Sequence, residues 1–284
     1  MDPYPDLPRT VGLLLATLVL AAILAVGTMV AFPNWPEMLR MALPTELALV
    51  AAIGWAVART RLGWRRALLL GRLEPATLLP LGLVLIGAIT VFGELYVVMQ
   101  KLVPVPAAFE ETLRELLRIS GPVDFAVTVG VAVVVAPILE EALFRGVVLQ
   151  GLARSRGPRA AVGWSAIFFS LFHLYNPWQI LPTFFLGLVL AWVVMTTRTL
   201  LSGILVHGAF NAISLGIYAG SVGDAPGGIS PQWFVAGLVA ALVLGSLSLL
   251  VGMAWLERVT GGGWFEGEGG PLDSSGSPVA PPPG

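Results

Sequence analysis

Residues 136–146 read Ala-Pro-Ile-Leu-Glu-Glu-Ala-Leu-Phe-Arg-Gly, so two adjacent carboxylates and an arginine stand in an otherwise apolar run. Glu141 and Arg145 are four residues apart, which puts them on one face of a helix where they can form an ion pair. Glu140 is rotated by about 100° from Glu141 and therefore has no partner on its own helix. The ion pair accounts for Glu141 and Arg145 structurally, and it leaves Glu140 as a candidate for chemistry.

The chain has two histidines, and both lie in apolar runs. His173 ends the sequence Phe169-Ser-Leu-Phe-His, and His207 begins His-Gly-Ala-Phe-Asn211. At a helical rise of about 1.5 Å per residue, Glu140 lies about 21 Å from the expected cytoplasmic end of its helix. The same count gives about 20 Å for His173 and Asn211 and about 14 Å for His207. We therefore expect three helices to bring acid–base groups to a similar depth.

The composition indicates a membrane protein. Apolar residues make up 56% of the chain and the 33 glycines add about 12%, so the total is roughly 68%, against 45–50% in soluble domains. Charged residues make up 12%, against about 25% in soluble domains. Ionisable groups inside a membrane are costly and are functional by default. The absence of cysteine excludes disulfides, thiolate zinc sites and cysteine nucleophiles. Scattered basic residues and a net charge of −1 argue against nucleic acid as a partner.

Apolar runs of about 20 residues predict an all-α, polytopic helix bundle with about eight spans in the cell membrane. The predicted spans are Val11–Phe32, Met41–Ala58, Ala76–Gln100, Val123–Ala153, Ala160–Tyr175, Trp178–Thr197, Leu201–Ala219 and Trp233–Leu256. The fourth run is longer than a bilayer is thick. Pro137 inside it predicts a bend, and a weakened hydrogen-bond ladder near Val133.

The predicted domain organisation is a short cytoplasmic N-terminus (1–10), a transmembrane domain (11–256) and a disordered cytoplasmic tail (257–284). Both termini are placed in the cytoplasm because most of the basic residues then lie on the inner side. Residues 107–119 have apolar and charged faces and predict an amphipathic helix on the membrane surface. Glu46 and Glu94 lie near span ends, where we expect interfacial water to solvate them.

Several intramembrane proteases are excluded by missing motifs. The chain has no His-Glu-x-x-His, which excludes a zinc site-2 protease, and no Gly-x-Gly-Asp, which disfavours a presenilin-like enzyme. Residues 163–166, Gly-Trp-Ser-Ala, match the rhomboid Gly-x-Ser-Gly poorly.

The remaining residues resemble the CPBP family, which includes type II CAAX prenyl endopeptidases and bacterial bacteriocin-processing Abi proteins. The family motifs are Glu-Glu-x-x-x-Arg, Phe-x-x-x-His and His-x-x-x-Asn/Asp. They stand here, in that order, as Glu140-Glu141…Arg145, Phe169…His173 and His207…Asn211. The resemblance covers about residues 122–219, where we expect a protease core, and it implies an intramembrane endopeptidase.

The resemblance also implies roles for these residues. Glu140 and His173 would activate a water molecule, and His207 and Asn211 would stabilise the oxyanion. Glu141, Arg145 and Phe169 would support them. The family is commonly labelled a metalloprotease group, and Glu140, His173 and His207 are the candidate ligands for Zn²⁺. Because oxyanion donation by His207 leaves only two ligands, we favour a mechanism without a cofactor.

The expected substrate is a peptide or lipidated protein, cleaved at a CAAX-like C-terminus or a leader peptide, and membrane lipid is the expected surrounding. Two other functions use the same polar residues. One is a proton-coupled transporter, against which the chain offers no visible inverted repeat of broken spans. The other is a non-catalytic membrane scaffold or immunity protein.

Overall fold

The computed structural model describes residues 5–60, 63–117, 119, 121–221 and 231–261, which form helices joined by turns, with no strand among them. The α-helices are α1 (Leu7–Ala31), α2 (Glu37–Thr60), α3 (Trp64–Ala67), α4 (Leu78–Leu102), α5 (Ala107–Leu116), α6 (Pro122–Val129), α7 (Ala136–Glu141), α8 (Leu149–Arg156), α9 (Pro158–Leu171), α10 (Ile180–Thr197), α11 (Leu200–Ser221) and α12 (Pro231–Thr260). Two 3-10 helices, η1 (Pro75–Thr77) and η4 (Pro177–Gln179), and two π-helices, η2 (Gly130–Val135) and η3 (Ala142–Val148), complete the chain order. The predicted all-α fold is confirmed.

Seven helical runs in the described residues are long and apolar enough to cross a membrane, so the protein is a multi-pass membrane protein. Their bounds are Leu7–Ala31, Glu37–Thr60, Pro75–Leu102, Pro122–Arg156, Pro177–Thr197, Leu200–Tyr218 and Val235–Thr260. They match seven of the predicted spans to within a few residues. The last helix runs on to Thr260, beyond the predicted end of the transmembrane domain, and residues 262–284 of the expected tail lie outside the described residues.

The remaining predicted span corresponds to α9, which has 14 residues and is shorter than the hydrocarbon core requires. The helix ends at Leu171, so His173 lies in the turn after it and not within a span as the sequence predicted. The final turn tightens, since the N–H of His173 donates to the carbonyl of Ser170 at 3.0 Å. Asn176 precedes Pro177 and is extended, because a proline disfavours helical geometry in the residue before it.

The segment after α9 extends to the C-terminal end of α4. The indole Nε1 of Trp178 donates to the carbonyl of Val103, just after α4, at 2.6 Å. The ring of Phe109 on α5 packs against Trp178, with 5.0 Å between centroids. The amphipathic helix predicted at residues 107–119 is therefore present as the shorter α5, and it packs against η4, which leads into α10.

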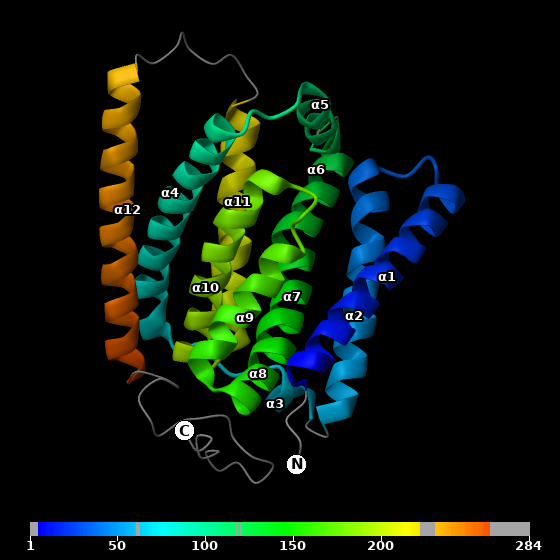
Figure 1. The fold of residues 1–284 in the computed structure, drawn as a ribbon, viewed down its shortest axis with the longest axis horizontal. Coiled ribbons are helices and arrows are strands. Elements are labelled where there is room, and N and C mark those ends of the chain that lie inside the picture. The colour runs from blue at the N-terminus through cyan, green and yellow to red at the C-terminus, as the bar shows by residue number, and fades with distance from the viewer. Residues whose placement is uncertain (1–4, 61–62, 118, 120, 222–230, 262–284) are drawn as a thin grey trace.

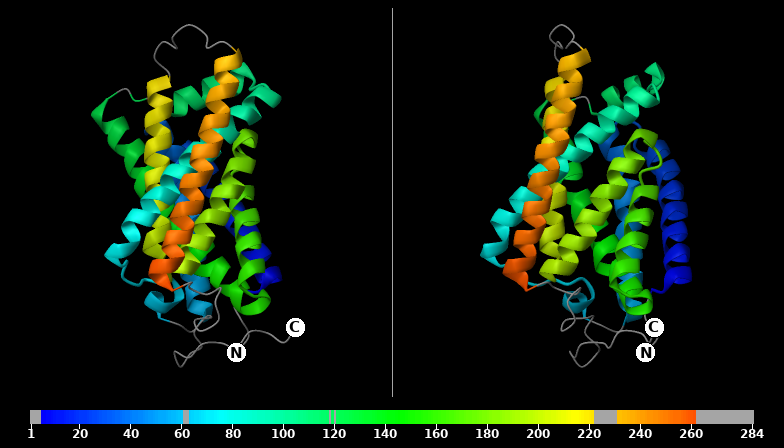
Figure 2. Two further views of the ribbon diagram at one scale, coloured as in Figure 1. Left: turned by 90° about the vertical axis from the view of Figure 1, so that its left-hand side faces the viewer. Right: turned by 60° about the vertical axis from the view of Figure 1, so that its left-hand side comes forward.

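The helices that carry the motif residues lie in the middle of the bundle. In Figure 1, α4 and α12 stand side by side at one edge, and α1 and α2 form the opposite edge. The fourth run, α9, α10 and α11 pack between these pairs. Figure 2 shows the same bundle from two further sides, with α1 beginning and α12 ending at the same end.

The fourth run is one continuous helix from Pro122 to Arg156 in which the hydrogen-bond pattern changes. η2 and η3 are π-helical, with bonds from residue i to residue i−5, and the short α7 between them carries the paired glutamates. The sequence predicted a bend at Pro137. In the structure, a π-helical turn precedes the proline, and such a wider turn gives its ring room beside the preceding carbonyls.

Candidate functional site

Glu141 and Arg145 form the predicted ion pair, and the structure buries it completely. Arg145 Nη1 donates to Glu141 Oε1 at 2.9 Å, and both side chains have 0% exposure. Arg145 Nη2 also donates to the carbonyl of Gly187 on α10, at 3.2 Å. The pair therefore joins the fourth run to α10. A buried ion pair persists only with such additional hydrogen bonds, because removing two charges from water is expensive.

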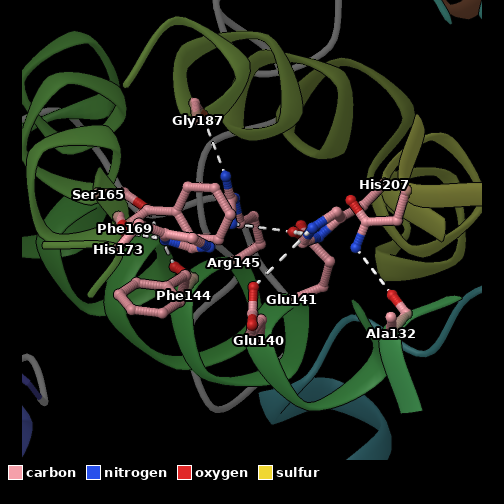
Figure 3. Close-up of polar contacts among 11 residues, drawn as sticks. Ala132, Glu140, Glu141, Phe144, Arg145, Ser165, Phe169, His173, Gly187 and His207 are labelled. Atoms are coloured by element: carbon pink, nitrogen blue, oxygen red, sulfur yellow. Dashed lines mark hydrogen bonds and ion pairs between the residues drawn. The ribbon is translucent and has the colours of Figure 1, made fainter. Parts of the chain in front are cut away.

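Phe169 is the central aromatic ring of the site. The guanidinium carbon of Arg145 lies 4.2 Å from the centroid of the Phe169 ring, which is a cation–π contact. The imidazole rings of His173 and His207 lie on this same ring, with centroid distances of 4.9 and 5.6 Å. Figure 3 shows the two imidazoles on either side of the cluster. The structure thus brings both histidines to one buried phenylalanine.

His207 contacts both glutamates of the fourth run. Its Nδ1 lies 2.9 Å from Oε1 of Glu141, and its Nε2 lies 3.9 Å from Oε2 of Glu140 (Figure 3). Because Glu141 is held as a carboxylate by Arg145, it accepts the hydrogen bond and Nδ1 of His207 donates. The spacing in the sequence predicted Arg145 as the partner of Glu141. In the structure, one oxygen of Glu141 serves both partners.

His173 has one ring nitrogen fixed by the backbone of its own chain segment. Its Nδ1 lies 2.9 Å from the carbonyl oxygen of Phe169. A carbonyl oxygen only accepts, so Nδ1 carries the hydrogen, and Nε2 of the neutral ring keeps a lone pair. His173 is therefore held in the tautomer that can take up a proton through Nε2.

Glu140 has fewer polar contacts than Glu141 among the described residues. Its side chain is 21% exposed, yet its Oε2 atom is buried and has no hydrogen-bond partner among the described residues. No hydrogen bond or ion pair joins it to His173 in the part of the chain that the structure describes. At 3.9 Å, the separation from His207 Nε2 is too long for a direct hydrogen bond. Such a separation is one that a bridging water can span.

Asn211 lies one helical turn beyond His207, at a different level from Glu140. Its Nδ2 donates to the carbonyl of Ala132 in η2, at 2.9 Å. The depth count from sequence placed Asn211, rather than His207, level with Glu140, and this was wrong. A π-helix advances less per residue than an α-helix, so η3 brings Glu140 closer to the end of its helix than a count at about 1.5 Å per residue suggests.

Zinc binding by Glu140, His173 and His207 finds no support in the geometry. Among the described residues, no group of three or more histidine, cysteine, aspartate or glutamate side chains is arranged to hold a metal ion. We therefore derive no step through a metal ion.

Some residues of the site carried no functional signal in the sequence. The carbonyls of Ala132 and Gly187 act through the backbone, which residue type does not reveal. Gly203 lies one turn before His207, and a Cβ there would come within 2.9 Å of Glu141 Oε2. The spacing of four between Gly203 and His207 is the signal that could have indicated a close approach on that face.

Glu46 also differs from its prediction. It was expected to be solvated at the membrane interface, but its Oε2 is buried without a hydrogen-bond partner among the described residues. Because α2 begins at Glu37, Glu46 falls well inside the helix.

An all-helical, multi-pass bundle with carboxylates and imidazoles buried between its helices is typical of a membrane protein with a functional site inside the bilayer. Residues 122–213 match the family model described as type II CAAX prenyl endopeptidase Rce1-like. The matched residues include all three motifs, which confirms the resemblance drawn from them. No curated protein and no solved structure matches the chain.

Proposed function

We propose that the protein is an intramembrane endopeptidase in which Glu140 and His173 activate the water that hydrolyses a peptide bond. The observation that carries the proposal is the buried Oε2 atom of Glu140, which has no hydrogen-bond partner among the described residues. It faces Nε2 of His207 at 3.9 Å. A carboxylate without a structural partner is available as a general base.

Water is the nucleophile in this mechanism. Its oxygen attacks the carbonyl carbon, and the proton that it loses passes to Glu140 with the help of Nε2 of His173. The carbon–nitrogen bond then breaks, and the proton returns to the leaving amine. The tautomer of His173 supports this role, because the hydrogen bond to Phe169 leaves the Nε2 lone pair free.

His207 and Asn211 are proposed to stabilise the oxyanion. The amide of Asn211 has two hydrogens, and the bond to Ala132 uses one of them. His207 donates through Nε2 only as an imidazolium, since its Nδ1 hydrogen is directed to Glu141. An oxyanion donor of this kind is worth about 3–4 kcal/mol in the transition state.

The proposed protease core is residues 122–219, and the proposed location is the cell membrane. The substrate would be a peptide or a lipidated protein with a CAAX-like C-terminus or a leader peptide. The polar residues of the site come from the fourth run, the turn after α9, and α11. A substrate must therefore present its peptide bond between these elements.

The test is a cleavage assay on the purified, reconstituted protein. Prenylated peptides ending in a CAAX-like tetrapeptide and a panel of leader peptides are incubated with it, and products are identified by mass spectrometry. We expect cleavage of at least one class. If no peptide is cleaved and the same vesicles carry a proton flux that depends on Glu140, the site belongs to a transporter. If neither activity is found, a non-catalytic role replaces the proposal.

A further inference from the structure

The carbonyl of Ala132 lacks a hydrogen-bond donor within its own helix. In η2 the N–H of Ala136 donates to the carbonyl of Val131, five residues earlier, as the π-helical pattern requires. The next bond in that pattern would run from the N–H of residue 137 to Ala132. Residue 137 is a proline and has no N–H, so the π-helical ladder stops there.

Asn211 supplies a donor to this same carbonyl. Its Nδ2 lies 2.9 Å from the oxygen of Ala132, and the residue comes from α11 (Figure 3 draws this bond to Ala132). α11 approaches the turn closely, because a Cβ at Gly208 would lie 2.8 Å from the carbonyl oxygen of Val133. The sequence predicted that Pro137 would weaken the ladder near Val133. Because the bonding before the proline is π-helical, the carbonyl that lacks a backbone donor is that of Ala132 and not that of Val133.

We propose that Asn211, in addition to its proposed contact with the oxyanion, positions α7 by replacing the hydrogen bond missing at Pro137. The bond fixes the turn that leads directly into α7, and α7 carries Glu140 three residues after the proline. One turn earlier on α11, His207 binds Glu141. α11 therefore holds the fourth run at two points, one on each side of Pro137. The effect on catalysis rests on the proposed function, whereas the effect on stability does not.

The test is a double-mutant cycle on the full chain in detergent, with thermal unfolding as the first readout. Asn211→Ala alone leaves the Ala132 carbonyl unpaired and is expected to lower the Tm by about 3–8 °C. In a Pro137→Ala background, the new N–H at position 137 gives the carbonyl a backbone donor. The same substitution should then lower the Tm by no more than about 2 °C.

A second proline provides the matched control. Pro44 lies inside α2, so a Pro44→Ala background restores an N–H without touching Ala132. There, Asn211→Ala should lower the Tm by as much as in the wild type. Equal losses in the Pro137→Ala background would overturn the inference. If Pro137→Ala does not fold, the Tm of Asn211→Leu is measured instead, because leucine keeps the size of the side chain and removes the hydrogen-bond donor. A wild-type Tm for Asn211→Leu would also overturn it.

Turnover separates positioning from mere packing. The kcat of Asn211→Ala/Pro137→Ala is expected to exceed that of Asn211→Ala by about tenfold, as part of the general-base contribution returns. A coupled Tm without any recovery of kcat would overturn the positioning role of Asn211. If the Tm losses are coupled but the wild-type protein cleaves no substrate, the inferred hydrogen bond stands and the proposed function is rejected instead.

Discussion

His207 and Glu141 connect α11 to α7 through a hydrogen bond of 2.9 Å between Nδ1 and Oε1, and both side chains are almost fully buried. The same oxygen accepts from Arg145 at 2.9 Å. This arrangement turns Nε2 of His207 toward Glu140. His207, one of the catalytic candidates, is therefore hydrogen-bonded to the supporting pair of Glu141 and Arg145, and changes in that pair should reach it.

Arg145→Ala is expected to destabilise the folded protein by about 3–5 kcal/mol, because it leaves the buried carboxylate of Glu141 without its cation. Folded yield and Tm should fall together with activity, and Glu141→Ala should behave similarly. The control is Arg114→Ala, since Arg114 and its partner Glu111 are both more than half exposed. A well-folded Arg145→Ala protein with no turnover would instead give Arg145 a direct part in the chemistry.

Gly203→Ala is expected to disturb the cluster through packing alone. Its Cβ would lie 2.7 Å from Cγ2 of Val194 and 2.9 Å from Oε2 of Glu141, so the carboxylate that holds His207 must move. Overpacking of this kind costs roughly 1–3 kcal/mol, and turnover should fall with stability. Gly216→Ala on the same helix meets no atom within 4 Å and serves as the control. Equal effects of the two substitutions would contradict this explanation.

The spans could be predicted from sequence because apolar length alone decides what crosses a bilayer. The Glu141–Arg145 pair could be predicted because a spacing of four is a local property of a helix. The contacts between helices could not. The bond from His207 to Glu141 depends on how α11 packs against α7. No residue spacing within a single helix indicates that packing.

The levels of Glu140 and Asn211 were miscounted for a different reason. A count at constant rise assumes α-helical geometry, whereas the fourth run contains two π-helical segments. The end of α9 before His173 was also missed, because the apolar residues of that run continue past the last helical turn. Both errors come from reading a hydrophobic pattern as a regular helix.

Proteolysis is expected to survive exhaustive chelation, and the purified protein should hold well under one metal ion per chain. The reason is that Glu140 and His173 are proposed to activate water directly, and the described side chains form no three-ligand group. Metal content by elemental analysis and activity before and after chelation provide the measurement. Stoichiometric zinc, with activity lost to the chelator and restored by zinc, would reverse the metal-free mechanism.

The orientation in the membrane can be measured with single cysteines, because the chain has none of its own. Arg66 lies in α3 in the basic segment between the second and third spans, and we expect Arg66→Cys to be labelled only after the membrane is permeabilised. Glu111→Cys on α5 should be labelled in intact cells and serves as the opposite control. The reverse pattern would place both termini outside the cytoplasm.

The turnover of Glu140→Gln on a confirmed substrate tests the central claim most directly. The substitution keeps the shape and removes the base, so kcat should fall by at least about 10²-fold while folding is retained. His173→Ala should cost about as much, and the double variant little more, because the two residues act as a unit. Glu94→Gln in α4 is the matched control and should cleave normally. Near-normal cleavage by Glu140→Gln would contradict the mechanism.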